Sequence, residues 1–235
     1  MRKQPKNHGI TIIQLLFAFV YVLIFPVLVL FLSGNWLWVE GLIFSIWFVI
    51  LCTTVIICVY IKDPALLAER YKLPGNKGHR KWDIAVVILL VVGFTGWIVM
   101  IPLDAERFNW TSHFPFWAKV LGGFFLIPSS ILFFRSYMDN SFLSGLVRIQ
   151  EERKQYVVTT GVYSFVRHPM YLGATFLFIG APLLMGSVFG LTFGILLTIL
   201  LAVRCIGEEK MLINELEGYV EYKKKVKYRF FPFIW

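Results

Sequence analysis

Long runs of apolar residues, each about the length of a membrane-crossing helix, dominate this chain. Four of them are clear: Ile10–Leu32, Trp38–Ile61, Ile84–Leu103 and Phe116–Phe134. A helix needs about 20 predominantly apolar residues to cross the hydrocarbon core, so each run predicts one span. A fifth apolar block, Tyr171–Val203, is too long for one span and is interrupted at Met185–Ser187. It predicts two short helices joined in a tight hairpin.

The polar connections between these runs alternate in charge. Two of them, residues 33–38 and Asp104–Pro115, hold one Arg between them, whereas Lys62–Trp82 holds six Lys and Arg. The segment Arg135–His168 and the C-terminal tail are basic again. By the positive-inside rule, the basic connections face the cytoplasm. The sequence therefore predicts an all-α integral membrane protein with six transmembrane helices, a cytoplasmic C-terminal helix and both termini in the cytoplasm.

Composition supports the membrane class and adds little beyond it. Apolar residues make up 58% of the chain and charged residues only 16%, so a water-soluble surface cannot be assembled from it. The net charge of +9 is then interpreted as a topology signal and as attraction to anionic lipid headgroups, not as nucleic-acid binding. The first apolar run follows a basic stretch without a small-residue cleavage site and is interpreted as a retained span. We expect a single membrane domain over residues 1–235, with four scaffold spans in residues 1–135.

The stretch GVYSFVRHPMYLG, residues 161–173, places an Arg-His-Pro triplet where the fifth apolar block begins. Pro169 keeps His168 out of the α region and suits the first position of a helix. Unpaired N–H groups at a helix N-terminus favour an anion, so the triplet can form an anion-receiving entrance at the membrane surface. An equally weighted alternative is a boundary motif in which Arg167 only snorkels to the interface.

Arg204 and Glu208 are four residues apart near the end of the last apolar run, so they share one face of a continuous helix, while Glu209 points elsewhere. Ionisable residues at the end of a span are functional when they face a polar pocket. The alternative is an exposed salt bridge of a few tenths of a kcal/mol.

Metal and nucleotide motifs are absent from the sequence. His8, His79, His113 and His168 form no cluster along it, and the three cysteines have no paired metal-ligand spacing. No Gly-x-Gly-x-x-Gly motif and no Walker loop occurs. We therefore expect no metal, no nucleic-acid partner and no conventional nucleotide fold.

Several motifs of the C-terminal third recur together in one known family. VVTTGVYSFVRHPMYLG, the apolar hairpin behind it, GEEKML and the ending GYVEYKKKV…RFFPFIW resemble the isoprenylcysteine carboxyl methyltransferase family of integral membrane enzymes. The resemblance covers residues 136–235. The upstream half looks like prokaryotic members, which implies a prokaryotic cell membrane rather than the endoplasmic reticulum.

The resemblance implies S-adenosylmethionine bound on the cytoplasmic side, in a pocket made by the last two spans and the C-terminal segment. Glu208 would hold a polar group of this cofactor, and Arg204 would bind the carboxylate of the methyl acceptor, which makes these two the expected catalytic residues. The remaining cofactor contacts implied are Gln150, the strand-like Gln155, Tyr156, Val157 and Val158, then Tyr163, His168, Pro169, Met170 and Tyr171.

The implied reaction is carboxyl O-methylation of a prenylcysteine-like substrate or another lipidated acceptor in the membrane. A carboxylate with an ordinary pKa near 3.5 is already ionised at neutral pH and needs no general base. The rival enzyme function is N-methylation of a phospholipid or other lipid amine, which requires loss of a proton first. A membrane transporter and a cofactor-binding scaffold are the alternatives outside enzymology; the chain shows no internal repeat of the kind common in transporters.

Overall fold

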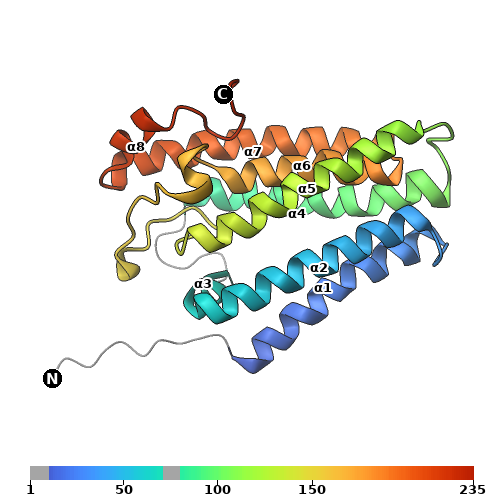
Figure 1. The fold of residues 1–235 in the computed structure, drawn as a ribbon, viewed down its shortest axis with the longest axis horizontal. Coiled ribbons are helices and arrows are strands. Elements are labelled where there is room, and N and C mark those ends of the chain that lie inside the picture. The colour runs from blue at the N-terminus through green and yellow to red at the C-terminus, as the bar shows by residue number, and fades with distance from the viewer. Residues whose placement is uncertain (1–10, 71–79) are drawn as a thin grey trace.

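Five long helices form the body of the described chain (Figure 1). A computed structural model describes residues 11–70 and 80–235. The five helices are α1 (Ile12–Ser33), α2 (Val39–Lys62), α4 (Lys81–Pro102), α5 (Phe116–Asp139) and α7 (Val188–Glu215). Each is long and apolar enough to cross a membrane. The expectation of an all-helical integral membrane protein is confirmed, and no β-strand occurs among the described residues.

The expected sixth span is shorter than the other five. It corresponds to α6 (Pro169–Met185), which has 17 residues and is apolar but falls below the length of a full span. Pro169 occupies its first turn and Gly186 ends it in the left-handed conformation with φ of 82°. Ser187 then caps the next helix by accepting a hydrogen bond from the Gly190 N–H. The break at Met185–Ser187 is therefore where the sequence predicts it.

The prediction that both hairpin helices are short is wrong for the second one. α7 has 28 residues, because its polar continuation after Val203 contains no proline and no terminating glycine before Glu215. The helix thus extends beyond the apolar run and carries Arg204, Glu208 and Glu209 on one continuous rod.

Short elements fill the connections. They are α3 (Pro64–Arg70), a π-helical turn (Leu103–Arg107), two 3₁₀ turns (Glu151–Arg153 and Gly161–Ser164) and α8 (Tyr219–Lys225). The segment 155–158, expected to be strand-like, belongs to no helix or strand in the described chain. Its residues face α7 and α8 across a cavity instead of pairing with a neighbouring strand.

In Figure 1, helices α4 to α7 run side by side, and α1 and α2 lie along one flank of that group. Small residues allow α5 and α6 to approach closely, as is common between helices in membranes. The Ser129 hydroxyl of α5 donates to the Gly173 carbonyl of α6 at 2.9 Å, and both partners are buried. This packing leaves the start of α6 and the second half of α7 next to each other at one end of the protein.

A buried carboxylate secures the hairpin turn at the opposite end. Asp104, fully buried, accepts hydrogen bonds from the Ser187 hydroxyl at 2.6 Å and the Thr111 hydroxyl at 2.9 Å, and from the Phe189 N–H at 3.2 Å. A buried carboxylate is stable only when it is satisfied in this way. The α6–α7 turn is therefore fixed by hydrogen bonds as well as by apolar packing.

Candidate functional site

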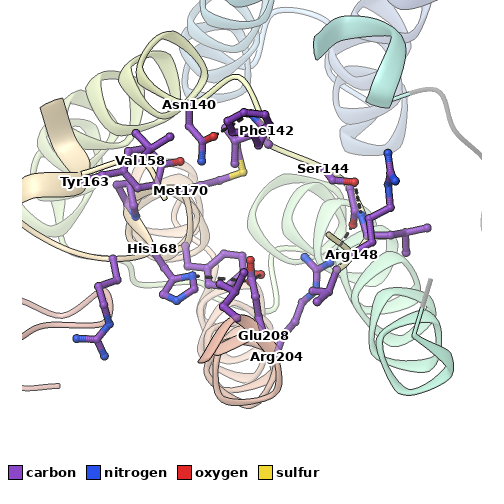
Figure 2. A pocket seen from close by; sticks show the side chains of 18 of the residues that line it. Asn140, Phe142, Ser144, Arg148, Val158, Tyr163, His168, Met170, Arg204 and Glu208 are labelled. Atoms are coloured by element: carbon purple, nitrogen blue, oxygen red, sulfur yellow. Dashed lines mark hydrogen bonds and ion pairs between the residues drawn. The ribbon is translucent and has the colours of Figure 1, made fainter. Parts of the chain in front are cut away.

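A cavity of about 680 Å³ opens at the end of the bundle where α6 begins (Figure 2). Its walls come from the loop after α5, from the segment 155–158, from the start of α6, and from the polar part of α7 with α8. In Figure 2, Tyr163 and His168 lie on one side of the cavity, Arg148 and Ser144 on the other, and Arg204 and Glu208 between them on α7. Polar groups from distant parts of the sequence therefore converge on one space.

The cavity brings together nearly all of the residues that the sequence singles out. Those that line it are Gln155, Tyr156, Val157, Val158, Tyr163, His168, Pro169, Met170, Tyr171, Arg204 and Glu208. Gln150 is the exception. Its side chain is fully buried, donates to the Phe142 carbonyl at 2.7 Å and accepts from Arg153 at 3.1 Å. Gln150 thus holds the loop together behind the cavity wall and does not line the space.

Glu208 is held at the cavity surface by α6. Its Oε2 accepts a hydrogen bond of 2.6 Å from the Tyr171 hydroxyl and lies 3.7 Å from Nδ1 of His168. The rings of His168 and Tyr171 stack in parallel, with centroids 5.3 Å apart and planes 8° apart. The Glu208 carboxylate and the Tyr171 ring therefore form one polar and aromatic surface, and these two groups suit a ligand carrying positive charge.

Arg204 is buried and paired with an acid that the sequence analysis did not single out. Its Nε donates to Oδ1 of Asp83 at 2.7 Å, and its Nη2 donates to Oδ2 at 3.2 Å and to the Gly145 carbonyl at 2.9 Å. Arg204 and Glu208 do share the cavity-facing side of α7, but the two are not each other's salt-bridge partner. The alternative interpretation, an exposed salt bridge between Arg204 and Glu208, is therefore wrong.

Glu209 is buried on a different side of α7 and organises a second ionic network. It accepts from Nε of Arg167 and, at 2.8 Å, from Nε of Arg229 in the C-terminal segment. Arg167 is buried as well and donates through Nη1 to the carbonyls of Val226 and Lys227. Arg167 therefore does not snorkel to an interface: it ties the C-terminal segment to the start of α6.

The N-terminus of α6 offers fewer free amides than the anion-entrance hypothesis needs. Pro169 has no N–H, and the N–H groups of Tyr171 and Leu172 both donate to the His168 carbonyl. Only the Met170 N–H lacks a backbone partner in the described part of the first turn. The backbone conformation of His168, φ −126° and ψ 66°, does lie outside the α region as Pro169 dictates.

Burial sets the protonation state of Tyr163 and affects that of His168. Burial raises the pKa of the Tyr163 phenol well above its usual value, so this hydroxyl stays neutral. For His168, burial alone would lower the pKa, but the adjacent Cys205, Glu209 and Glu208 outweigh it and raise the pKa to about 10. The imidazole is therefore a cation at neutral pH.

His168, Cys205 and Glu209 also bring potential metal-ligand atoms within 4.8 Å of one another, although the sequence places no such residues at ligand spacing. The Glu209 carboxylate already accepts from two arginines. A divalent cation would have to enter beside both guanidinium groups, so we interpret the cluster as part of the ionic network.

Arg148 is a cavity residue that the sequence analysis missed. It donates to Glu69 of α3 through Nε at 2.8 Å and Nη2 at 2.7 Å, and it also contacts Glu152. In the sequence this residue is only one arginine in a polar loop of the kind that is usually exposed to solvent. Its partner on α3 is 79 residues away, and no sequence pattern links the two.

The fold and the site together define the class of this protein. It is an all-helical integral membrane protein with a polar, aromatic cavity at one end of its helices. Residues 117–217 match the family model described as phospholipid methyltransferase. This part of the chain is therefore similar to membrane methyltransferases, in agreement with the motifs seen in the sequence.

Two curated relatives carry the name protein-S-isoprenylcysteine O-methyltransferase. The one from Saccharomyces cerevisiae is 40% identical over 85 residues, and the one from Schizosaccharomyces pombe is 33% identical over 85 residues. In both cases the match covers 35% of this chain and 36% of the relative, so the chain spans about a third of the length of these relatives.

A solved structure, that of the eukaryotic intramembrane Ras methyltransferase ICMT, is 18% identical to this chain. The alignment covers 97% of this chain and 90% of the other, with a TM-score of 0.46.

Proposed function

We propose that this protein transfers a methyl group from S-adenosylmethionine to a lipid-borne acceptor, and that the acceptor group is a carboxylate. The observation that carries the proposal is the placement of Glu208 and Arg204 one helical turn apart in a single cavity. Each is held by a partner from another helix. The match of residues 117–217 to the phospholipid methyltransferase model supports the reaction class.

The cavity residues fit the cofactor chemically. S-adenosylmethionine carries a sulfonium, an ammonium and a carboxylate. Glu208 with the rings of Tyr163 and Tyr171 suits the cationic groups. His168 presents Nδ1 to Glu208 at 3.7 Å, whereas its Nε2 lies 3.5 Å from Glu209 in the buried ionic network. When bound, the cofactor supplies a methyl group on sulfur, and the C–S electron pair stays with sulfur as the methyl leaves.

The role of Arg204 follows from the partners it already has. With Nε and Nη2 engaged, Nη1 is the guanidinium nitrogen without a hydrogen-bond partner among the described residues. A single NH₂ nitrogen can orient an acceptor carboxylate without neutralising its oxygens. The acceptor oxygen then remains nucleophilic, and no base is needed because the carboxylate is ionised at neutral pH. Catalysis rests on orientation and on exclusion of water.

A second cavity supports a lipidic acceptor. It has a volume of about 780 Å³ and lies between α1, α2 and α5, with Leu177 of α6. None of its lining residues carries a formal charge. Tyr21 and Phe133 line both cavities, so an apolar tail in this one can place its head group in the polar cavity. Burying an apolar tail is favourable by about 25 cal/mol per Å².

The second candidate function is N-methylation of a lipid amine. The Asp83 carboxylate favours it, because that group offsets the charge of Arg204 and lowers the repulsion felt by an ammonium. The matching family model is also that of phospholipid methyltransferases. This reaction needs a base for the ammonium, and Glu208 is the carboxylate on the cavity wall next to Arg204 that could take the proton.

The experiment measures binding and transfer separately on the purified protein in detergent. Calorimetry with S-adenosylmethionine should show binding that Glu208→Ala weakens by at least about tenfold. Methyl transfer is then followed with labelled cofactor over lipid-tailed carboxylates, thiols and amines. Arg204→Ala should keep cofactor binding and lose turnover. Absence of both binding and transfer in the wild-type protein would refute the proposal, and transfer to amines alone would establish the second candidate.

A further inference from the structure

We infer that Asp83 is a positioning residue for the methyl acceptor: it sets the orientation and the net charge of Arg204 and thereby selects the acceptor's head group. The inference rests on the proposed function, since it assigns Arg204 to the acceptor. Asp83 lies in the first turn of α4, 121 residues away from Arg204 in sequence. No family motif of the C-terminal third contains it.

The geometry of the Asp83–Arg204 pair fixes the orientation of the guanidinium group. Asp83 is fully buried, and its two oxygens accept from Nε and Nη2 of Arg204 at 2.7 and 3.2 Å. This side-on, two-point contact allows one orientation of the planar group. The free edge of the guanidinium, which carries Nη1, is therefore held in place by α4.

A close contact between α4 and α7 brings the pair together. The ring of Trp82 lies where a side chain on Gly207 would be: a Cβ at Gly207 would come within 2.6 Å of the ring. Trp82 precedes Asp83, and Gly207 is one turn after Arg204. The glycine therefore permits the approach that puts the carboxylate within hydrogen-bond distance of the guanidinium.

Asp83 also positions the loop that forms a cavity wall. Its Oδ2 accepts a hydrogen bond of 2.6 Å from the Val147 N–H, and Nη2 of Arg204 donates to the Gly145 carbonyl. Val147 and Gly145 both line the polar cavity. The pair thus joins α4, α7 and the loop at one point, so a change at Asp83 acts on the acceptor side of the cavity.

The formal charges around Arg204 explain how Asp83 selects the head group of the acceptor. Asp83 cancels the formal charge of Arg204, and Glu208 adds a negative charge one turn away. An acceptor carboxylate is therefore held by the Nη1 nitrogen of a charge-compensated arginine and not by a free cation. Without the Asp83 charge, Arg204 would attract carboxylates more strongly, and an oxygen held tightly by a cation attacks more slowly.

The test uses three probes with the same farnesyl tail and different head groups: N-acetyl-S-farnesylcysteine, its carboxamide and S-farnesylcysteamine. Affinity and, where transfer occurs, kcat and KM are measured for the full-length wild type and for Asp83→Asn, which keeps the shape and removes the charge. For Asp83→Asn we expect carboxylate affinity to rise on the order of tenfold, carboxamide affinity to stay the same and amine affinity to fall. The kcat for the carboxylate should fall while its KM falls too.

Equal changes for all three probes, or no change for any, would overturn the inference, because a merely structural role cannot distinguish the head groups. The affinity readout does not require catalysis, so failure of the proposed function, seen as missing cofactor binding in the wild type, is a separate result. Asp83→Glu, which keeps the negative charge, should restore part of the wild-type order of affinities for the three probes.

Two further variants control for stability. Asp104 is equally buried and hydrogen-bonded but lies at the other end of the bundle, so Asp104→Asn should destabilise the protein without changing the ranking of the probes. If Asp83→Asn does not fold, the double variant Asp83→Asn/Arg204→Gln removes both charges. It should fold and bind carboxylate and carboxamide probes equally. A double variant that still prefers the carboxylate would contradict the inference.

Discussion

The Tyr171 hydroxyl donates a hydrogen bond of 2.6 Å to Glu208, which links α6 to α7 inside the polar cavity. The ring of Tyr171 also stacks on His168 and lies 5.9 Å from the guanidinium of Arg204. Tyr171 therefore contacts the proposed cofactor side and the proposed acceptor side of the cavity at once. Its hydroxyl has a role that can be tested separately from that of its ring.

Tyr171→Phe should weaken S-adenosylmethionine binding by roughly tenfold while leaving the fold intact. The ring stack is kept, but Glu208 loses a donor whose hydrogen bond to a charged group contributes about 1.5–3 kcal/mol. Calorimetry gives the dissociation constant. Tyr60→Phe on the exposed side of α2 is the matched control and should change nothing. An unchanged affinity in Tyr171→Phe would show that Glu208 does not depend on this donor.

Glu209→Gln should destabilise the protein by about 3–5 kcal/mol, because Arg167 and Arg229 would lose the carboxylate that compensates their charge in a buried site. The apparent Tm in detergent measures the effect. Glu217→Gln, at an exposed position near α8, should leave the Tm within about 1 °C. If the two variants melt alike, the ionic network does not hold the C-terminal segment.

Leu51→Trp should shorten the longest tail that the protein accepts. Leu51 lines the apolar cavity between α1, α2 and α5, and the larger side chain fills space that a long tail would occupy. Turnover of farnesyl-length probes should fall about tenfold relative to short-tailed ones. Ile50→Trp, on the exposed side of the same helix, is the control. Equal loss for both tail lengths would place the tail elsewhere.

The stability contributed by His168 should disappear at alkaline pH. The folded-state pKa is raised to about 10, above the usual 6.5, because Cys205, Glu208 and Glu209 favour the cation more than burial disfavours it. The contribution is thus fully present below about pH 6.5 and is lost as pH rises through about 10. The gap in free energy of unfolding between wild type and His168→Gln should shrink over that window.

His113→Gln, at an exposed position outside the cavity, is the matched control substitution and should leave the free energy of unfolding nearly unchanged. The ring of Tyr171 on α6 also stacks on His168, and the Arg229 carbonyl in the C-terminal segment accepts from the His168 N–H. A gap that stays constant from pH 6 to 10 would contradict the raised pKa.

The spans were predictable because each is a local apolar run whose length matches the bilayer. The hairpin break was predictable for the same reason, since Gly186 and Ser187 are the local signals that end one helix and begin the next. The length of α7 was not, because hydropathy reports where a membrane span ends and not where the helix ends. A polar stretch with good helix formers simply continues the helix beyond the apolar run.

The hydrogen-bond partners of the site residues could not be predicted from the sequence. Glu208 and Arg204 were found because i,i+4 spacing is a local rule. Asp83 pairs with Arg204 over 121 residues, and an acid in the first turn of a helix is already explained by the helix dipole. Glu209 seemed to face away from the site, yet the C-terminal segment packs on that side and buries it. The sides of α7 that carry Glu208 and Glu209 therefore both face other parts of the protein.

α7 bears the groups proposed for donor and acceptor four residues apart, and a helix rises about 1.5 Å per residue. The spacing between methyl source and methyl target is therefore built into the pitch of a single rigid rod, so tilting or sliding that rod carries both along without changing their separation. A different recipient molecule would have to be accommodated by altering the surrounding walls, which leaves the reaction distance untouched.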